Sequence, residues 1–94
     1  MNNRIELKLD RSVTRLAGFE YGKNVYEEQV KGKINTSLPV TFIFPDNIKK
    51  LASSFIQGFF AELVESIGIS GIERNVGIES SNELLKKDIL YNLL

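Results

Sequence analysis

Two consecutive serines, Ser53 and Ser54, are the residues of this chain whose type and position could do chemistry. They follow an apolar segment at residues 40–44 and a short polar loop, and they open a long apolar stretch with helical periodicity. A hydroxyl at the start of a helix can accept a phosphate, and the unpaired N–H groups beside it can bind an anion. The purely structural alternative is a capping box, because Ser54 and Gln57 have the S-x-x-Q spacing that caps a helix N-terminus.

The composition of the chain excludes several kinds of catalytic and metal site. The chain has no histidine and no cysteine, which removes the commonest general base, thiol nucleophiles, disulfides and most zinc sites. A catalytic site would have to be built from Asp, Glu, Lys, Ser or Tyr, and no such cluster stands out in the sequence. We therefore expect no enzymatic activity, no metal and no cofactor.

Length and charge describe the kind of domain. The 94 residues suit one domain, residues 1–94, and the formal net charge is zero. A neutral chain is not expected to bind nucleic acid or an anionic membrane in general. The polar, alternating N-terminal segment does not resemble a signal peptide and no spanning helix stands out, so we expect a cytoplasmic protein.

The elements that must hold the serines follow from periodicity. Alternation predicts a strand at residues 5–9, and residues 11–18 read as a turn with a short second strand. A first helix is expected from about residue 20 to Gly32. The apolar residues 40–44 predict a central strand covered on both faces, followed by a helix that ends at Gly68. A loop at residues 69–75, a strand at 76–79 and a last helix capped by Ser80 complete the pattern, which indicates an α/β fold with a small mixed sheet of three to five strands and about three helices.

The long helix has an unusual second face. At about 100° per residue its large apolar side chains share one arc, while Ser54, Gly58, Ala61 and Glu65 line another. A solvated face rarely carries glycine, which costs roughly 1 kcal/mol relative to alanine inside a helix. The small residues indicate either close packing within the domain or a flat surface for a partner protein, and the sequence leaves both open.

Two polar residues and four cations lie near the serines in the expected fold. Asp46 and Asn47 end the central strand, at the edge where open α/β sheets place ligands, although both types also form turns. The cations could gather beside the serines and attract an anion, or be scattered on the surface; they are Arg11, Arg15, Lys49 and Lys50.

The run from PVTFIFPDN through SSFIQGFFAEL resembles the core of a STAS domain, the fold of anti-sigma-factor antagonists, and most closely a STAS-like bacterial family. The resemblance extends from about Phe19 to the C-terminus. In antagonist STAS domains this loop reads Asp-Ser-Ser/Thr-Gly, and a GHKL-type kinase phosphorylates the second hydroxyl. Here Ser53 and Ser54 keep the hydroxyl pair, while Ala52 and Phe55 stand at the aspartate and glycine positions.

The resemblance and the residues together predict a noncatalytic, STAS-like regulatory module. It would dock a protein partner, a GHKL-type ATPase or another regulator, through the loop and the start of the second helix. The expected contact residues are Asp46, Asn47, Ser54, Gln57, Gly58 and Ala61, with Ser54 or, less directly, Ser53 as the phosphorylation site. The alternative is a small domain that binds an anion or nucleotide at the same helix N-terminus. The sequence leaves the oligomeric state open.

Overall fold

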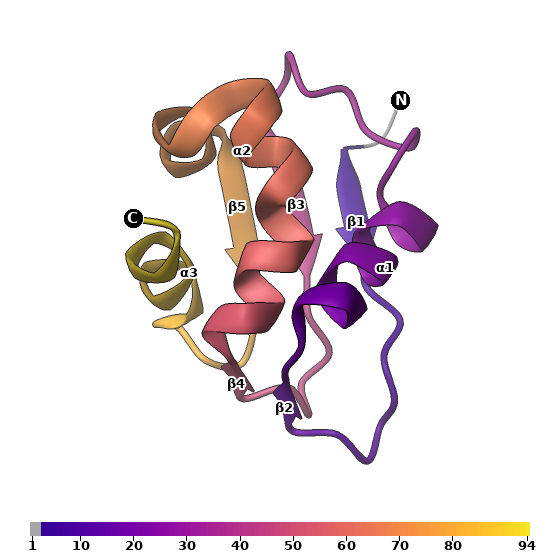
Figure 1. Cartoon of the computed structure of the whole chain (residues 1–94). Helices are drawn as coiled ribbons and strands as arrows, with labels where there is room; N and C mark the ends of the chain where they lie inside the picture. Colours follow the sequence, from indigo (N-terminus) through magenta and orange to yellow (C-terminus); the bar gives the residue numbers. More distant parts are fainter. Residues whose placement is uncertain (1–2) are drawn as a thin grey trace.

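The computed structural model describes residues 3–94, which form five strands and three helices (Figure 1). Their order is β1 (Arg4–Glu6), β2 (Arg15–Leu16), α1 (Phe19–Gln29), β3 (Val40–Ile43), β4 (Lys50–Leu51), α2 (Ser53–Asn75), β5 (Val76–Glu79) and α3 (Leu85–Leu93). This confirms the predicted small α/β fold with three helices. The expected short strand within residues 11–18 is β2, whereas β4 lies in a segment that we expected to be a loop.

The strands form two separate sheets, and every pairing is parallel. In the main sheet the order is β1-β3-β5, with Phe42 of β3 flanked by Ile5 and Ile78. In the small sheet Leu16 of β2 pairs with Leu51 of β4. Because each of these short strands runs directly into a helix, the small sheet brings the N-termini of α1 and α2 together beyond the carboxyl ends of the main strands (Figure 1).

The main sheet is covered by helices on one face only. Phe42 packs against Phe59 of α2, so the buried alternate residues Val40, Phe42 and Phe44 face the helices, whereas Thr41 and Ile43 are half-buried on the other side. The expectation that helices cover both faces is therefore wrong. On the uncovered face Arg4 of β1 makes a two-pronged ion pair with Glu79 of β5, at 2.8 and 3.1 Å. The pair bridges the two edge strands and gives this face a polar surface.

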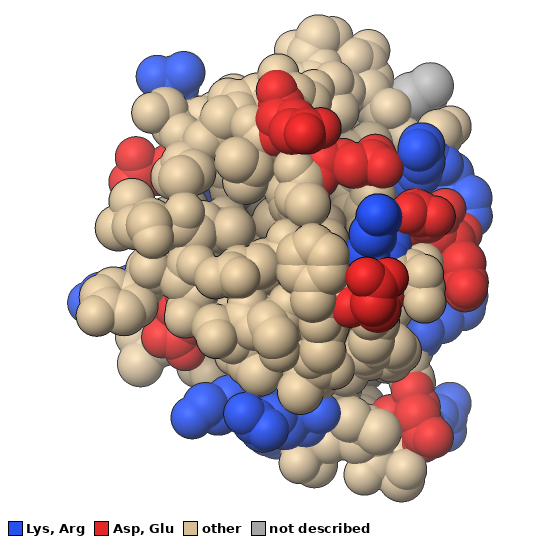
Figure 2. All heavy atoms as spheres, in the orientation of Figure 1, with Lys and Arg blue, Asp and Glu red and all other residues tan. Residues whose placement is uncertain are grey.

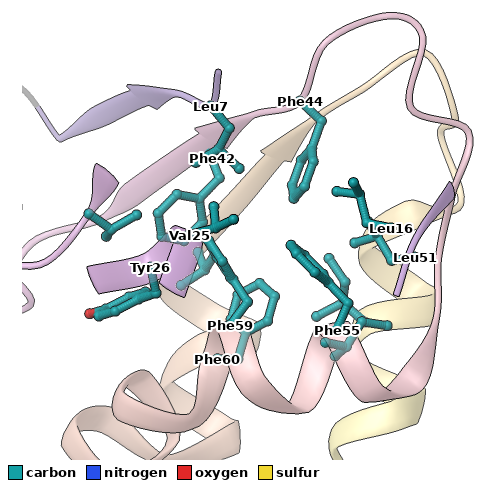
Figure 3. Close-up of a cluster of buried hydrophobic side chains, with 14 of the residues drawn as sticks. Leu7, Leu16, Val25, Tyr26, Phe42, Phe44, Leu51, Phe55, Phe59 and Phe60 are labelled. Carbon is teal, nitrogen blue, oxygen red and sulfur yellow. The ribbon is translucent and has the colours of Figure 1, made fainter. Parts of the chain in front are cut away.

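The core is built around the phenylalanines of α2 (Figure 3). Phe59 lies edge-on to Phe42 of the sheet with ring centroids 5.2 Å apart, and edge-on to Tyr26 of α1 at 5.6 Å. Edge-to-face pairs of this kind add to the gain from burying the rings. Among the described helices, α2 alone has a length and composition that would suit a membrane span, but its large side chains fill this core, as in the central helix of a globular domain.

Gly68 marks a break within α2. Its backbone has φ +72° and ψ 169°, a conformation that is essentially restricted to glycine, so the helix bends here. The helical conformation is interrupted at Gly68, where we expected the helix to end, but the chain resumes a helical path instead of forming the expected loop at residues 69–75. The second half of α2 therefore folds back toward α3.

Candidate functional site

Ser54 connects α2 to α1 rather than capping its own helix. α2 begins at Ser53 with Ala52 in the N-cap position, and no side chain caps it, so the predicted Ser54–Gln57 capping box is wrong. The Ser54 hydroxyl instead accepts a hydrogen bond of 2.9 Å from the backbone N–H of Gly18. Gly18 is the N-cap of α1. It has φ +106°, and as a glycine it has no side chain of its own to cap the helix. The predicted cap of the last helix at Ser80 is also wrong, because α3 begins only at Leu85 and its N-cap is Leu84.

The two serines differ in accessibility. Ser54 is half-buried between the helix N-termini, whereas Ser53 is exposed. A kinase needs a hydroxyl that it can reach, so this difference bears on the predicted phosphorylation site, for which the sequence favoured Ser54 over Ser53. Ser53 is the accessible hydroxyl of the pair.

Gly58 lies at the crossing of α1 and α2 and is buried. A Cβ at this position would overlap the carbonyl oxygen of Phe19 and come within 3.1 Å of the Lys23 nitrogen. Gly22 of α1 makes the reciprocal close approach to α2, since a Cβ there would overlap the carbonyl oxygen of Phe55. The prediction that Gly58 contacts a partner is corrected: its smallness serves helix packing within the domain.

The exposed side of α2 lies farther around the helix than we expected. Ser53 and Gln57 are exposed, and Ala61 and Val64 are half-buried, at spacings of four, four and three residues that place them along one line. We call this line the α2 ridge: Ser53, Gln57, Ala61 and Val64. It contains no charge, and Figure 2 shows a broad surface without charged side chains over α2 and α3. Gln57 is thus exposed, Ser54 and Ala61 are half-buried, and Gly58 is buried.

Asp46 and Asn47 lie at the carboxyl end of β3, as predicted, but the side chain of Asn47 is engaged in hydrogen bonds within the domain. Its side-chain amide donates to the carbonyl oxygens of Asp10 at 3.1 Å and Val13 at 2.6 Å. These bonds join the loop after β3 to the loop after β1. Asp46 is exposed, and its backbone carbonyl accepts a bond from the Ser81 hydroxyl at 3.1 Å.

A shallow open depression lies between these two loops. Apolar residues and two cations line it together with the loop residues just described: Leu7, Lys8, Leu9, Arg11, Pro45, Asp46 and Asn47. Asp10 borders the same loop, and hydrogen bonds from the backbone N–H and the hydroxyl of Ser12 lower the pKa of its carboxyl group. This carboxylate is thus tied to the turn that shapes the loop.

Three of the four cations singled out in the sequence come together at the small sheet. Arg15 and Lys50 are register partners in β2 and β4, and Lys49 adjoins them, with its ammonium donating to the Ser81 hydroxyl at 3.0 Å. Figure 2 shows basic side chains gathered at the lower end of the molecule, where Figure 1 places β2 and β4. Arg11 stands apart from them, at the depression.

Sequence reasoning missed Gly22 and β4. The signal for Gly22 was present, since a glycine inside each of two amphipathic helices indicates a close helix crossing. No local signal marks β4, which has two residues and is defined by its partner.

Comparisons of this chain with protein-family models, with curated proteins and with solved structures found no match.

Proposed function

We propose that this chain is a noncatalytic interaction module of the STAS-like kind that docks a protein partner through the α2 ridge. The observation that carries the proposal is the ridge itself, an uncharged and accessible line on the helix that also forms the core. Interfaces place uncharged residues at their centre and charged residues at their rim. Here acidic residues of α2 border the ridge, including Glu62 and Glu65.

The chemistry of the described residues supports a noncatalytic role. Catalytic groups usually lie in partly buried sites that shift their pKa values. Among residues 3–94 no charged side chain is buried, and the chain contains neither histidine nor cysteine. The resemblance to STAS domains points in the same direction, toward a regulator that acts by binding.

Phosphorylation at Ser53 would give the docking surface a switch. A phosphate there adds about −1.5 to −2 charges beside the N-terminus of α2, where the helix dipole favours negative charge. The fold would tolerate the group, because Ser53 is exposed and makes no side-chain contact that the fold needs. A partner seated on the ridge would be displaced. A GHKL-type kinase is the enzyme that the resemblance suggests.

Affinity capture tests the docking proposal. The wild-type chain is used as bait, and Gln57→Lys and Ser53→Glu variants are compared with Asn24→Lys, which places the charge of Gln57→Lys on the exposed side of α1. We expect the first two variants to lose a partner that wild type and Asn24→Lys retain. Retention of every partner by all the variants would reject the ridge as the docking surface.

Anion binding is the second candidate, and the cations at the carboxyl end of the sheet favour it. Lys8 and Arg11 line the depression between the loops, and the N-termini of α1 and α2 lie at the same end. In this case inorganic phosphate or ATP raises the thermal midpoint of wild type, and Arg11→Ala removes the increase. No change of the midpoint with either anion would exclude this candidate.

A further inference from the structure

A groove between the second half of α2 and α3 is a separate feature from the α2 ridge. It has a volume of about 420 Å³ and is open to solvent. Four of its lining residues are apolar or aromatic, two are charged and one is a serine: Ile69, Leu90, Tyr91, Leu94, Glu73, Lys87 and Ser70. None of them belongs to the ridge. In Figure 1 the groove lies where the orange end of α2 faces the yellow α3.

The groove is preformed and apolar at its centre. The Lys86 ammonium donates to the backbone carbonyl of Glu73 at 3.1 Å, which holds α3 against α2. Ile69 and Leu90 are half-buried in it, whereas the Tyr91 side chain at its side is 77% exposed. A large aromatic residue this exposed beside an apolar groove is typical of a contact surface.

The charges of the groove stand on opposite walls. Glu73 belongs to α2 and Lys87 to α3, so each wall carries one charge of opposite sign. Among residues 3–94 the ion pairs are Arg4–Glu79 and Lys31–Glu62, so neither Glu73 nor Lys87 has a partner of opposite charge within 4.0 Å. Both charges are thus available to another molecule.

We infer that the occupant of this groove is a second copy of the same chain, related by a two-fold axis. A two-fold interface uses the same patch on both subunits, so any contact between residues i and j occurs twice. A patch with an exposed aromatic residue, an apolar groove and one charge of each sign meets this condition. Tyr91 of each copy enters the groove of the other, and Glu73 of each copy faces Lys87 of the other. The groove is lined by seven residues, whereas a stable interface involves about 20–30 residues on each side, so the dimer is weak, with a dissociation constant on the order of micromolar or higher.

Sedimentation equilibrium with charge-reversal variants tests this inference. The protein is studied from about 1 µM to about 1 mM, the range in which a weak dimer forms. Wild type associates, whereas Glu73→Lys and Lys87→Glu each weaken association about tenfold or more, because both copies then carry like charges at both contacts. A mixture of the two variants forms a heterodimer in which both pairs are attractive again, so association returns.

Two further variants complete the design. Tyr91→Ala is expected to weaken association about tenfold or more, whereas Glu65→Lys, which makes the same charge change on α2 outside the groove, leaves it unchanged. Circular dichroism verifies that each variant is folded. A wild-type chain that stays monomeric over the whole range, or a mixture of the reversed variants that associates no better than either alone, would overturn the inference. The result is independent of the ridge, because no ridge residue is changed.

Discussion

Gly22 and Gly58 set the distance between α1 and α2. Each presents bare backbone to the other helix at a point where a methyl group would overlap a carbonyl oxygen. Such an oxygen belongs to a helix and can yield only if the helix shifts. The small face that seemed suited to an external partner is therefore occupied by a neighbouring helix of the same domain.

A methyl group at Gly58 tests this helix crossing. Gly58→Ala should lower the free energy of unfolding by roughly 1–3 kcal/mol, because the strain of overpacking exceeds the gain of about 1 kcal/mol in helix propensity. Gln57→Ala, one residue away and exposed, should change it by less than about 0.5 kcal/mol. Urea unfolding measures both values. A Gly58→Ala variant as stable as wild type would mean that the helices do not cross at this glycine.

The two serines offer a matched pair of substitutions. Ser54→Ala removes the acceptor of the Gly18 N–H and should cost about 1 kcal/mol, whereas Ser53→Ala should be close to neutral. Thermal and urea unfolding of the two variants test this directly. If Ser54 were only a member of a capping box, Gln57→Ala would destabilise the protein as well, and we expect that it does not.

The carboxyl group of Asp10 makes the stability of the fold depend on pH. The bonds from Ser12 lower the pKa of its carboxyl group in the folded state, so this group stabilises the fold above its unfolded pKa and loses that effect as the pH falls through the folded pKa. In an NMR titration Ser12→Ala should raise the pKa of Asp10 toward its ordinary value. Equal titration midpoints in wild type and variant would show that the Ser12 hydroxyl does not stabilise this carboxylate.

At the scale of the elements, α2 is a long apolar helix whose direction changes at one residue. Gly68 has φ +72°, and a Cβ there would find no atom within 4 Å. Any cost of a side chain at this position therefore comes from the backbone alone. The bend turns the second half of α2 toward α3 and so creates the groove.

Gly68→Ala should accordingly destabilise the protein by about 1–3 kcal/mol, the cost of forcing a non-glycine residue into this conformation. Ser70→Ala, two residues farther on and exposed, is the control and should be close to neutral. Chemical unfolding compares the two variants. Equal stability would mean that α2 does not bend at Gly68.

Periodicity was sufficient to predict α1, β3, β5 and most of α2, because each has an apolar pattern that recurs over several residues. It was insufficient where a residue acts through a distant part of the chain. Ser54 bonds to Gly18 across 36 positions, and Asn47 reaches Asp10 across 37. Local spacing suggested a cap and a turn, since both residue types also serve those roles. Contacts of this kind depend on the tertiary fold, so only the structure could separate the buried side of α2 from the exposed one.

At the scale of the whole molecule, the fold separates its surfaces. One face of the main sheet is covered by helices, and the other carries the Arg4–Glu79 ion pair. The cations of the small sheet lie at one end, while the α2 ridge occupies the uncharged surface on the helical side. No ridge residue lines the depression that holds Lys8 and Arg11, so docking and anion binding can be separated by experiment.

The affinity of the Ala61→Lys variant for a partner captured by wild type tests the central claim most directly. Ala61 lies in the middle of the α2 ridge and is half-buried, with no charge on the ridge beside it. Calorimetry should find at least about a tenfold weaker dissociation constant than for wild type, or about 1.4 kcal/mol, while Asn24→Lys binds as wild type does and both variants keep the wild-type thermal midpoint. Equal affinities of Ala61→Lys and wild type would contradict the assignment of the ridge as the docking surface.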